Sequence, residues 1–368
     1  MGNVRSVVVS DLHLGTRSGA DVLARGAARE PLLEVVHGAD QVVLLGDTLE
    51  LRDRPLADVV AAARDFVGAL GEAAAGARVV LVAGNHDHQL AAPILEPRRL
   101  RHAGPLESEQ LAAPGRSGPA AAVARALGRA ELVVAYPGLW LRPDVYATHG
   151  HYLDCHMSIP TFEALAASLV QRLVGGMPEH DHRPDDYEAV LAPIYAFTFA
   201  LAQAGRRAGP TAGGGASLKV WDRVNRASGR RLGLEAKLIG GLLVPGAAAA
   251  LNRAGLGPFG SNLSATAIRR AGLEALREVV RRLGIDADHV VFGHTHRPGP
   301  IDGIDSIADW AGPDSARLTN CGSWVYEPRL VSDSPRSSAY WPGTCVVVDD
   351  EGPPQLLRLL LDVAGDQL

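Results

Sequence analysis

The stretch "VVFGHTHRPGP", residues 290–300, places two histidines, His294 and His296, directly after a run of apolar residues. A buried strand that ends in two imidazoles one residue apart has two explanations. The pair could belong to an ordinary polar turn, because histidines do occur in turns. Alternatively, both rings could bind one metal centre, because imidazole is a common ligand of transition metals. The other motifs in the chain distinguish between these two interpretations.

Four other short runs rich in β-branched residues resemble this one. The five expected strands are residues 4–10, 41–46, 78–84, 144–150 and 289–293. Helical stretches such as 56–75 and 264–283 separate them, and continuous apolar runs of this length are typical of buried strands in a layered α/β fold. We also predict a loop with one short helix at 98–130 and a β-hairpin at 344–361.

Each of the five runs ends in side chains that can bind a metal ion. The candidate ligands are Asp11, His13, Asp47, Asn85, His149, His294 and His296. Loops at the carboxyl ends of strands in an α/β sheet converge on the ligand site, so the five turns should bring their donors to one place. Any one of these short motifs alone is more often an ordinary turn. Their combination favours a metal centre.

The type and number of donors indicate which ions would bind. Two divalent cations bring four positive charges and Asp11 and Asp47 return two, so the site keeps a net charge of about +2. A bridging water would lose a proton near neutral pH, and the remaining charge would attract a phosphate. The many nitrogen donors disfavour Mg²⁺ and Ca²⁺, and no thiolate is present to favour a soft metal. We therefore expect two divalent transition metal ions, Mn²⁺, Fe or Zn²⁺.

The motifs "DLH", "GD", "GNHD", "HGH" and "GHTH", in this order, resemble those of the calcineurin-like metallophosphoesterase superfamily. The resemblance covers residues 4–156 and 286–325. It implies a two-sheet sandwich flanked by helices, in which a metal-bridged hydroxide cleaves a phosphomonoester, phosphodiester or pyrophosphate. It assigns Asp11, His13 and His296 to one metal, Asn85, His149 and His294 to the other, and Asp47 to a bridging position.

Two further residues are candidates for a catalytic role. His86 follows Asn85 directly, so it should face the cleft without binding metal. It is the expected general acid, because imidazole titrates near neutral pH and the superfamily uses a histidine here in the same role. Glu50 lies three residues after Asp47, at the position of a carboxylate that often orients this histidine. A solvated residue at a helix start explains Glu50 equally well.

Within the superfamily, "SDLHLG", "GDTLE", "HGHYLDCH" and "GHTHRP" look most like the bacterial UDP-diacylglucosamine pyrophosphohydrolases. Those enzymes usually carry arginine at the position of His86 and aspartate at that of His151, and their segment between the last two motifs is shorter. We therefore expect a phosphoesterase core formed by residues 1–156 and 286–368, with a mainly helical cap at 157–285.

The expected cap contains three helical or largely apolar stretches, at 161–176, 186–205 and 233–255, and a glycine-rich loop at 208–217. None has an uninterrupted apolar run long enough to span a membrane. The helices could line a pocket for an acyl chain. Packing on one another and on the core is the commoner use of such helices.

Three more side chains could contact the substrate, namely Arg17, His151 and Arg297. Arg17 and Arg297 lie next to ligand loops and could bind a substrate phosphate, but structural ion pairs would explain them equally well. His151 could instead support the metal ligands.

The composition narrows the choice of partner. The chain has 368 residues, 47 % hydrophobic and 21 % charged, which is enough to bury a large core. The net charge of −5 argues against a dedicated nucleic-acid or anionic-membrane surface. We expect a phosphorylated small-molecule or lipid-like substrate, no nucleic acid, and at most peripheral membrane contact. A nuclease and a non-catalytic scaffold of the same fold are the alternatives, and the oligomeric state stays open.

The cysteines indicate the compartment. Cys155, Cys321 and Cys345 are far apart and odd in number, which is not the pattern of a disulfide framework. No signal peptide is visible. Arginine far outnumbers lysine, as is typical of GC-rich bacterial genomes. We therefore expect a bacterial protein located in the cytoplasm.

Overall fold

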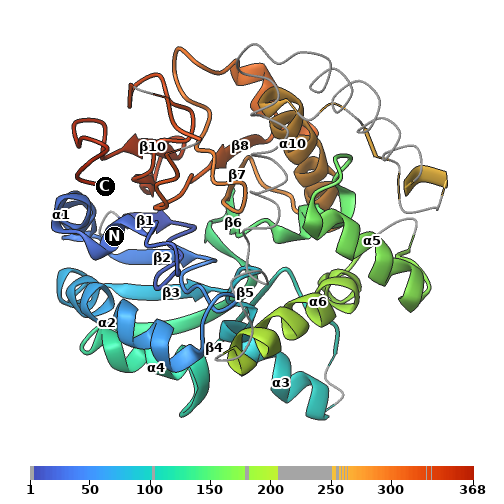
Figure 1. The fold of residues 1–368 in the computed structure, drawn as a ribbon, viewed down its shortest axis with the longest axis horizontal. Helices are drawn as coiled ribbons and strands as arrows, with labels where there is room; N and C mark the ends of the chain where they lie inside the picture. The colour runs from blue at the N-terminus through green and yellow to red at the C-terminus, as the bar shows by residue number, and fades with distance from the viewer. Residues whose placement is uncertain are drawn as a thin grey trace. The chain divides into compact units, whose positions relative to one another are not determined.

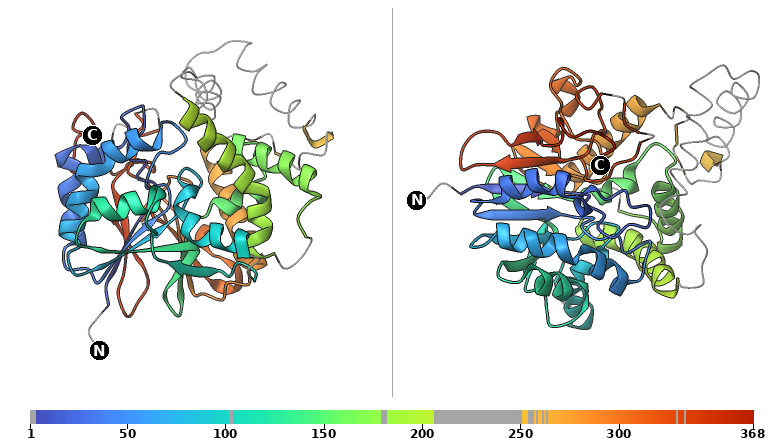
Figure 2. Two further views of the ribbon diagram at one scale, coloured as in Figure 1. Left: turned by 90° about the horizontal axis from the view of Figure 1, so that it is seen from below. Right: turned by 60° about the vertical axis from the view of Figure 1, so that its left-hand side comes forward.

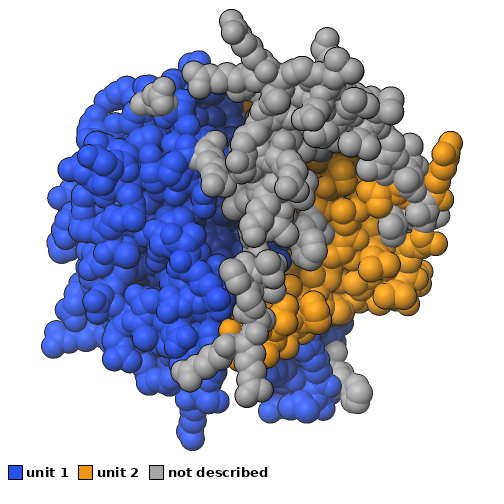
Figure 3. Space-filling model, viewed as in Figure 1, with its two compact units in different colours: residues 1–151, 284–368 blue, residues 152–283 orange. Residues whose placement is uncertain are grey.

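The computed structural model describes residues 4–101, 104–178, 182–205, 251–253, 257, 259–260, 262, 264–328, 330–332 and 334–368. The chain divides into two compact units, shown in blue and orange in Figure 3. The first unit consists of Met1–His151 and Gly284–Leu368, and the second of Tyr152–Leu283.

A sheet of ten strands forms the centre of the first unit within the described residues (Figures 1 and 2). The strand order is β10-β9-β1-β2-β3-β5-β6-β7-β8, and β4 pairs with β5 beside this path. The strands are β1 (Ser6–Val9), β2 (Gln41–Leu45), β3 (Arg78–Val82), β4 (Glu109–Ala112), β5 (Glu131–Arg142), β6 (Val145–Thr148), β7 (His289–Phe292), β8 (Arg317–Asn320), β9 (Thr344–Val348) and β10 (Gln355–Arg358).

The strands that carry the candidate ligands are buried. In the parallel strands β1, β2 and β3, Val8 pairs with Val43 and Val43 pairs with Val80. These side chains are almost fully buried and belong to one apolar cluster that also includes Val291 of β7. Continuous β-branched runs suit such strands because both faces of the sheet are covered. The hairpin expected at 344–361 is present as the antiparallel pair β9 and β10.

The two separate sheets that we expected are not what the hydrogen bonding shows. β5 is 12 residues long; Glu131–Ala135 pairs with β3, and the part from Gly138 to Arg142 pairs with β6. This one strand joins all the others into a continuous sheet. The length of β5 was not apparent in the sequence, because Pro137 and Gly138 usually interrupt a strand. The region 98–130 also holds more structure than one short helix, since it contains β4.

Within the described residues, four α-helices belong to the first unit: α1 (Gly26–Val36), α2 (Leu56–Ala73), α3 (Ala92–Arg101) and α4 (Gly118–Leu127). The central helix α2 packs against α1 and α4. It buries Val59, Ala63, Phe66, Val67 and Leu70, whose spacing of three or four residues places them on one helical face. The described 3₁₀ helices of this unit are η1 (Val22–Ala24), η2 (His88–Ala91), η5 (Ile307–Trp310) and η6 (Pro313–Ser315), whereas η3 (His151–His156) lies in the second unit except for His151.

The described part of the second unit is helical. Its helices are α5 (Phe162–Val174), α6 (Pro184–Ala204) and α10 (Ala265–Arg282). Thr161 and Ser264 cap α5 and α10, each accepting a hydrogen bond from a backbone N–H of the first turn. The loop expected at 208–217 and most of the helical stretch expected at 233–255 lie outside the described residues. No helix in the described parts of the chain is both long and apolar enough to cross a membrane.

Candidate metal centre

The turns that follow β1, β2, β3, β6 and β7 bring the candidate ligands together. Among the residues that the structure describes, three groups of side chains have ligand atoms within 4.8 Å of one another. They are Asp11–His13–His296, Asp47–His149–His294 and His13–Glu50–His86. Asn85 contacts the second group through its side-chain amide. The convergence that we expected from the positions of the motifs is therefore present in the structure.

The first group directs unshared electron pairs toward one point. His13 Nδ1 lies 2.9 Å from Glu50 Oε2, so this nitrogen donates and Nε2 faces inward. His13 Nε2 is 3.0 Å from His296 Nε2, which in turn is 3.2 Å from Asp11 Oδ1. Asp11 Oδ1 is buried and makes no hydrogen bond to any described residue. Facing acceptors of this kind are satisfied by a cation.

The second group has the same character. His149 Nδ1 lies 2.9 Å from the Leu45 carbonyl, to which it donates, so His149 Nε2 faces inward. The Asn85 oxygen is 3.2 Å from His149 Nε2, 3.1 Å from His294 Nδ1 and 3.1 Å from Asp47 Oδ2. The Asn85 oxygen and Asp47 Oδ2 are both acceptors, a pair that a cation between them would satisfy; with the amide rotated by 180°, its nitrogen would instead donate to Asp47 Oδ2.

Asp47 lies between the two groups. Its Oδ2 is 3.7 Å from His13 Nε2 and 3.4 Å from His149 Nε2. The other carboxylate oxygen accepts a 2.8 Å hydrogen bond from the backbone N–H of His86, which fixes the orientation of the carboxylate. One oxygen of Asp47 is thus placed to be shared by both groups.

The site concentrates negative charge. Burial alone would raise the pKa of Asp11, Asp47 and Glu50, but the surrounding histidines hold each pKa well below its usual range. The carboxylates in turn attract positive charge. Although burial lowers it, the charge of Asp47 and a hydrogen bond to it raise the pKa of His149 to about 9. Ionised carboxylates with imidazoles are a donor set that suits divalent transition metals.

Two glycines allow the backbone to approach these side chains closely. A Cβ atom on Gly84 would overlap the Asp47 carboxylate and the His149 ring, and one on Gly293 would overlap the Asp11 carboxylate. Both glycines come directly before candidate ligands. Because they have no Cβ atom, they leave room for the side chains of Asp11, Asp47 and His149.

Glu50 connects His86 to the first group. Its Oε2 lies 2.7 Å from His86 Nδ1 and 2.9 Å from His13 Nδ1. Glu50 is buried, so the explanation as a solvated helix-start residue does not hold. The His86 ring is more accessible, and its Nε2 lies 3.2 Å from Arg52 Nη1.

The structure places the three candidate substrate-binding residues differently. Arg297 is buried and pairs with Asp305 through two contacts of 2.9 and 2.7 Å. Of the two expected roles, substrate binding and a structural ion pair, this contact corresponds to the ion pair. Arg17 is exposed, and no contact seen among the described residues joins it to a candidate ligand. His151 is buried, with Nε2 3.1 Å from the Tyr136 hydroxyl and its ring 5.6 Å from that of His149.

Asp87 is a residue whose part in the site we did not anticipate. It is fully buried and accepts hydrogen bonds from the backbone N–H groups of Asp47, Thr48, Leu49 and Gly84. It therefore holds the turns after β2 and β3 in place. Its place in the "GNHD" motif was the one sign of a role in the site. The sequence does not show which backbone N–H groups donate to its carboxylate.

Asn320, at the end of β8, holds the turn after β7. Its amide nitrogen donates to the carbonyl of Gly293 (2.8 Å) and to the hydroxyl of Thr295 (3.0 Å). The two histidines of the opening stretch are therefore fixed by a residue about 25 positions further along the chain, which no local pattern indicates.

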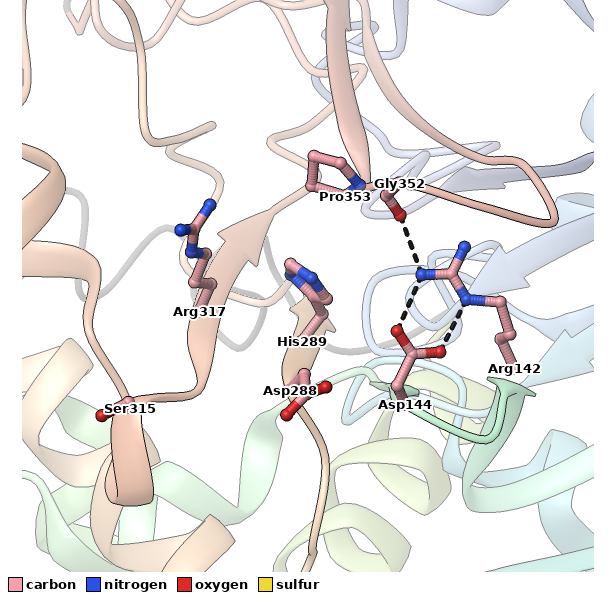
Figure 4. Close-up of a pocket in the computed structure, with 8 residues that line it drawn as sticks. All are labelled: Arg142, Asp144, Asp288, His289, Ser315, Arg317, Gly352 and Pro353. Carbon is pink, nitrogen blue, oxygen red and sulfur yellow. Dashed lines mark hydrogen bonds and ion pairs between the residues drawn. The ribbon is translucent and has the colours of Figure 1, made fainter.

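A cavity of about 450 Å³ lies at the opposite ends of β6, β7 and β8 (Figure 4). Two arginines and two aspartates line it, so their charges balance. Arg142 is already bound to Asp144 through contacts of 2.6 and 2.8 Å, and it donates to the carbonyl of Gly352. We assign no function to this cavity.

The fold and the site agree with a comparison to known families. The family model of the calcineurin-like phosphoesterases matches residues 4–190, and the chain belongs to this family. It is a metal-dependent phosphoesterase, a hydrolase that acts on a phosphorylated substrate. Among solved structures, a dimetal phosphatase from Danio rerio is 14 % identical, with a TM-score of 0.30 over 97 % of this chain and 99 % of that chain. No curated protein matches the sequence.

Proposed function

We propose that the protein is a binuclear metallophosphoesterase that cleaves a phosphomonoester, a phosphodiester or a pyrophosphate. The observation that supports this most directly is the position of Asp47, whose Oδ2 lies within 3.7 Å of His13 Nε2 and 3.4 Å of His149 Nε2. A single carboxylate oxygen between two sets of facing acceptors is suited to two cations that share a ligand.

In this proposal each group of side chains holds one ion. The ligands are Asp11, His13 and His296 for the first ion and Asn85, His149 and His294 for the second, with Asp47 shared. Mn²⁺, Fe and Zn²⁺ all suit this donor set. When bound, the ions would polarise the phosphoryl oxygens and lower the pKa of a water molecule.

The remaining chemistry falls to His86 and Glu50. Glu50 accepts a hydrogen bond from His86 Nδ1, which fixes the ring and leaves Nε2 as the atom that gives a proton to the leaving oxygen. Because the same Glu50 oxygen contacts His13, one carboxylate positions both the acid and a proposed metal ligand. The location of His86 directly after Asn85 keeps the acid next to the reacting phosphate.

We also propose that residues 157–285 form a cap that selects the substrate, whereas residues 1–156 and 286–368 form the catalytic core. This division is supported by the compactness of Tyr152–Leu283 and by its helices α5, α6 and α10. The candidate ligands all come from the first unit, so the second unit is free to determine specificity. A cytoplasmic location is favoured by the three cysteines, which are all free thiols.

A hydrolysis screen tests the function. The Mn²⁺-loaded protein is assayed against aryl phosphates, nucleotides, sugar nucleotides and lipid phosphates, with and without a chelator. We expect hydrolysis of at least one class, lost on chelation and absent from Asp47→Asn. A metal-loaded protein that hydrolyses none of these classes would contradict the proposal.

A further inference from the structure

Asn320 is a fully buried asparagine that contacts the turn carrying His294 and His296. Its side-chain nitrogen donates to the Gly293 carbonyl (2.8 Å) and to the Thr295 hydroxyl (3.0 Å). Gly293 and Thr295 flank His294 in the sequence, and Thr295 directly precedes His296. One amide therefore contacts the turn on both sides of the first histidine and next to the second.

The orientation of the Asn320 amide is determined by its partners. Its oxygen accepts a 2.7 Å hydrogen bond from the backbone N–H of Gly322. In the reverse orientation the amide nitrogen would face this N–H group and the oxygen would face the Gly293 carbonyl, so neither contact would be a hydrogen bond. The backbone of Asn320 also pairs with Gly299, donating at 2.8 Å and accepting at 3.1 Å. Asn320 thus binds the turn at its beginning, Gly293, and at its end, Gly299.

The turn between these two glycines has an unfavourable backbone conformation. His294 and His296 have positive φ angles of 67° and 57°. Residues other than glycine seldom adopt such angles, and the conformation persists only where surrounding contacts impose it. The backbone N–H of His294 donates to Asp11 Oδ2 (2.9 Å), which is one such contact. The hydrogen bonds of Asn320 are others, and they act on both sides of His294.

We propose that Asn320 is a positioning residue for both metal ions. This inference rests on the proposed function, in which His294 binds one ion and His296 binds the other. Because one buried amide holds the turn that carries both imidazoles, loss of its hydrogen bonds should displace a ligand of each ion at once. Hydrogen bonds that orient metal ligands commonly change metal affinity by about 10- to 100-fold. A residue that only stabilises the fold would leave the affinity and geometry of a folded site unchanged.

Two substitutions separate the two hydrogen bonds. In Asn320→Asp a carboxylate oxygen replaces the amide nitrogen, so an acceptor faces the Gly293 carbonyl, whereas the Thr295 hydroxyl can still donate to the carboxylate. Thr295→Val nearly keeps the shape of the side chain and removes the hydroxyl that accepts from Asn320. The added negative charge in Asn320→Asp would by itself strengthen the binding of a cation. Weaker metal binding by this variant would therefore result from lost positioning.

The test is a titration of metal-free protein with Co²⁺, whose visible absorption depends on the geometry of its ligands. We expect the wild type to bind about two ions. Asn320→Asp should bind both about 10- to 100-fold more weakly and with a changed spectrum, and Thr295→Val should show a smaller loss. His149→Ala is the comparison, because it removes a proposed ligand of one ion only. Val67→Ala, on the buried face of α2, is the control for lost stability and should keep the affinity and the spectrum of the wild type.

The outcomes separate this inference from the proposed function. Wild-type affinity and spectrum in a folded Asn320→Asp would overturn the role of Asn320, and so would a loss confined to one ion. If that variant does not fold, unchanged binding of both ions by Thr295→Val would overturn it instead. A wild type that binds a single ion would contradict the binuclear centre and with it this inference. A wild type that binds two ions but hydrolyses no phosphoester would contradict the proposed function, whereas weaker binding of both ions by the variants would still support the role of Asn320.

Discussion

At the scale of single residues, five of the seven candidate ligands adopt a left-handed backbone conformation that is unfavourable for them. The five with positive φ angles, between 46° and 67°, are Asp11, His13, Asp47, His294 and His296. This left-handed conformation costs an ordinary residue about 1 kcal/mol or more, and glycine would adopt it freely. Aspartate and histidine at these angles indicate that the site requires their side chains.

The backbone cost can be measured at His294. In metal-free protein, His294→Gly should be more stable than His294→Ala by about 1 kcal/mol, because glycine removes the penalty of the positive φ angle. Both variants should bind less metal. Chemical denaturation in the presence of a chelator provides the comparison. Equal stability of the two variants would show that the turn relaxes and stores no strain.

His86 should affect rate rather than metal binding. We expect His86→Ala to keep both metals and to lose activity by about 10²–10⁴-fold. The loss should be smaller for nitrophenyl esters than for alkyl esters, because a good leaving group needs little protonation. Kinetics on the two ester types, with metal analysis of the same samples, tests this. Equal losses on both would assign His86 to positioning.

At the scale of secondary structure elements, the sequence predicted the ligand-bearing strands well and the connection between them poorly. The sequence shows β-branched runs at β1, β2, β3, β6 and β7, which identifies them as strands. Each run ends in one of the motifs, which identifies it as a strand that carries a candidate ligand. β5 was missed because Pro137 and Gly138 lie within it. The hydrogen bonds of Glu50 and Asp87 could not be predicted, because they depend on how distant turns meet.

The second unit contains a pH-sensitive contact between elements. His156, at the end of η3, lies 2.8 Å from the hydroxyl of Tyr187 on α6. Burial, and then the charge of Arg282, lower the pKa of His156 from 6.5 to about 4. The folded state therefore keeps His156 neutral at pH values where the unfolded chain takes up a proton.

The sign of the resulting pH dependence follows from this shift. Stability contributed by neutral His156 is present above about pH 6.5 and is lost as the pH falls toward 4. We expect the Tm of the wild type to fall more steeply between these values than that of His156→Gln, which cannot titrate. Thermal unfolding at a series of pH values measures the difference. Parallel curves for the two proteins would contradict the shift.

At the scale of the whole molecule, the sheet does not require the second unit for its continuity. β6 and β7 pair directly, with Val145 opposite His289 and Ala147 opposite Val291. Residues 160–282, which lie between these two strands, can therefore be replaced without removing a strand or a candidate ligand from the first unit.

Replacing residues 160–282 with a short Gly/Ser linker tests the proposed cap. We expect the shortened protein to bind metal and to hydrolyse small aryl phosphates at a similar rate, because all the candidate ligands remain. Activity on larger substrates found in the screen should fall steeply, because the cap provides contacts that set KM. A shortened protein that keeps its full substrate profile would show that the segment has no part in recognition.

The central claim is that two metal ions share Asp47, and elemental analysis tests it most directly. Wild type and Asp47→Ala are stripped with a chelator, reloaded with excess Mn²⁺, freed of unbound metal and analysed for metal per chain. We predict about two ions per chain for the wild type, and a loss at both positions in the variant. A wild type that holds no more than one ion, or a variant that keeps its full metal content, would contradict the binuclear centre.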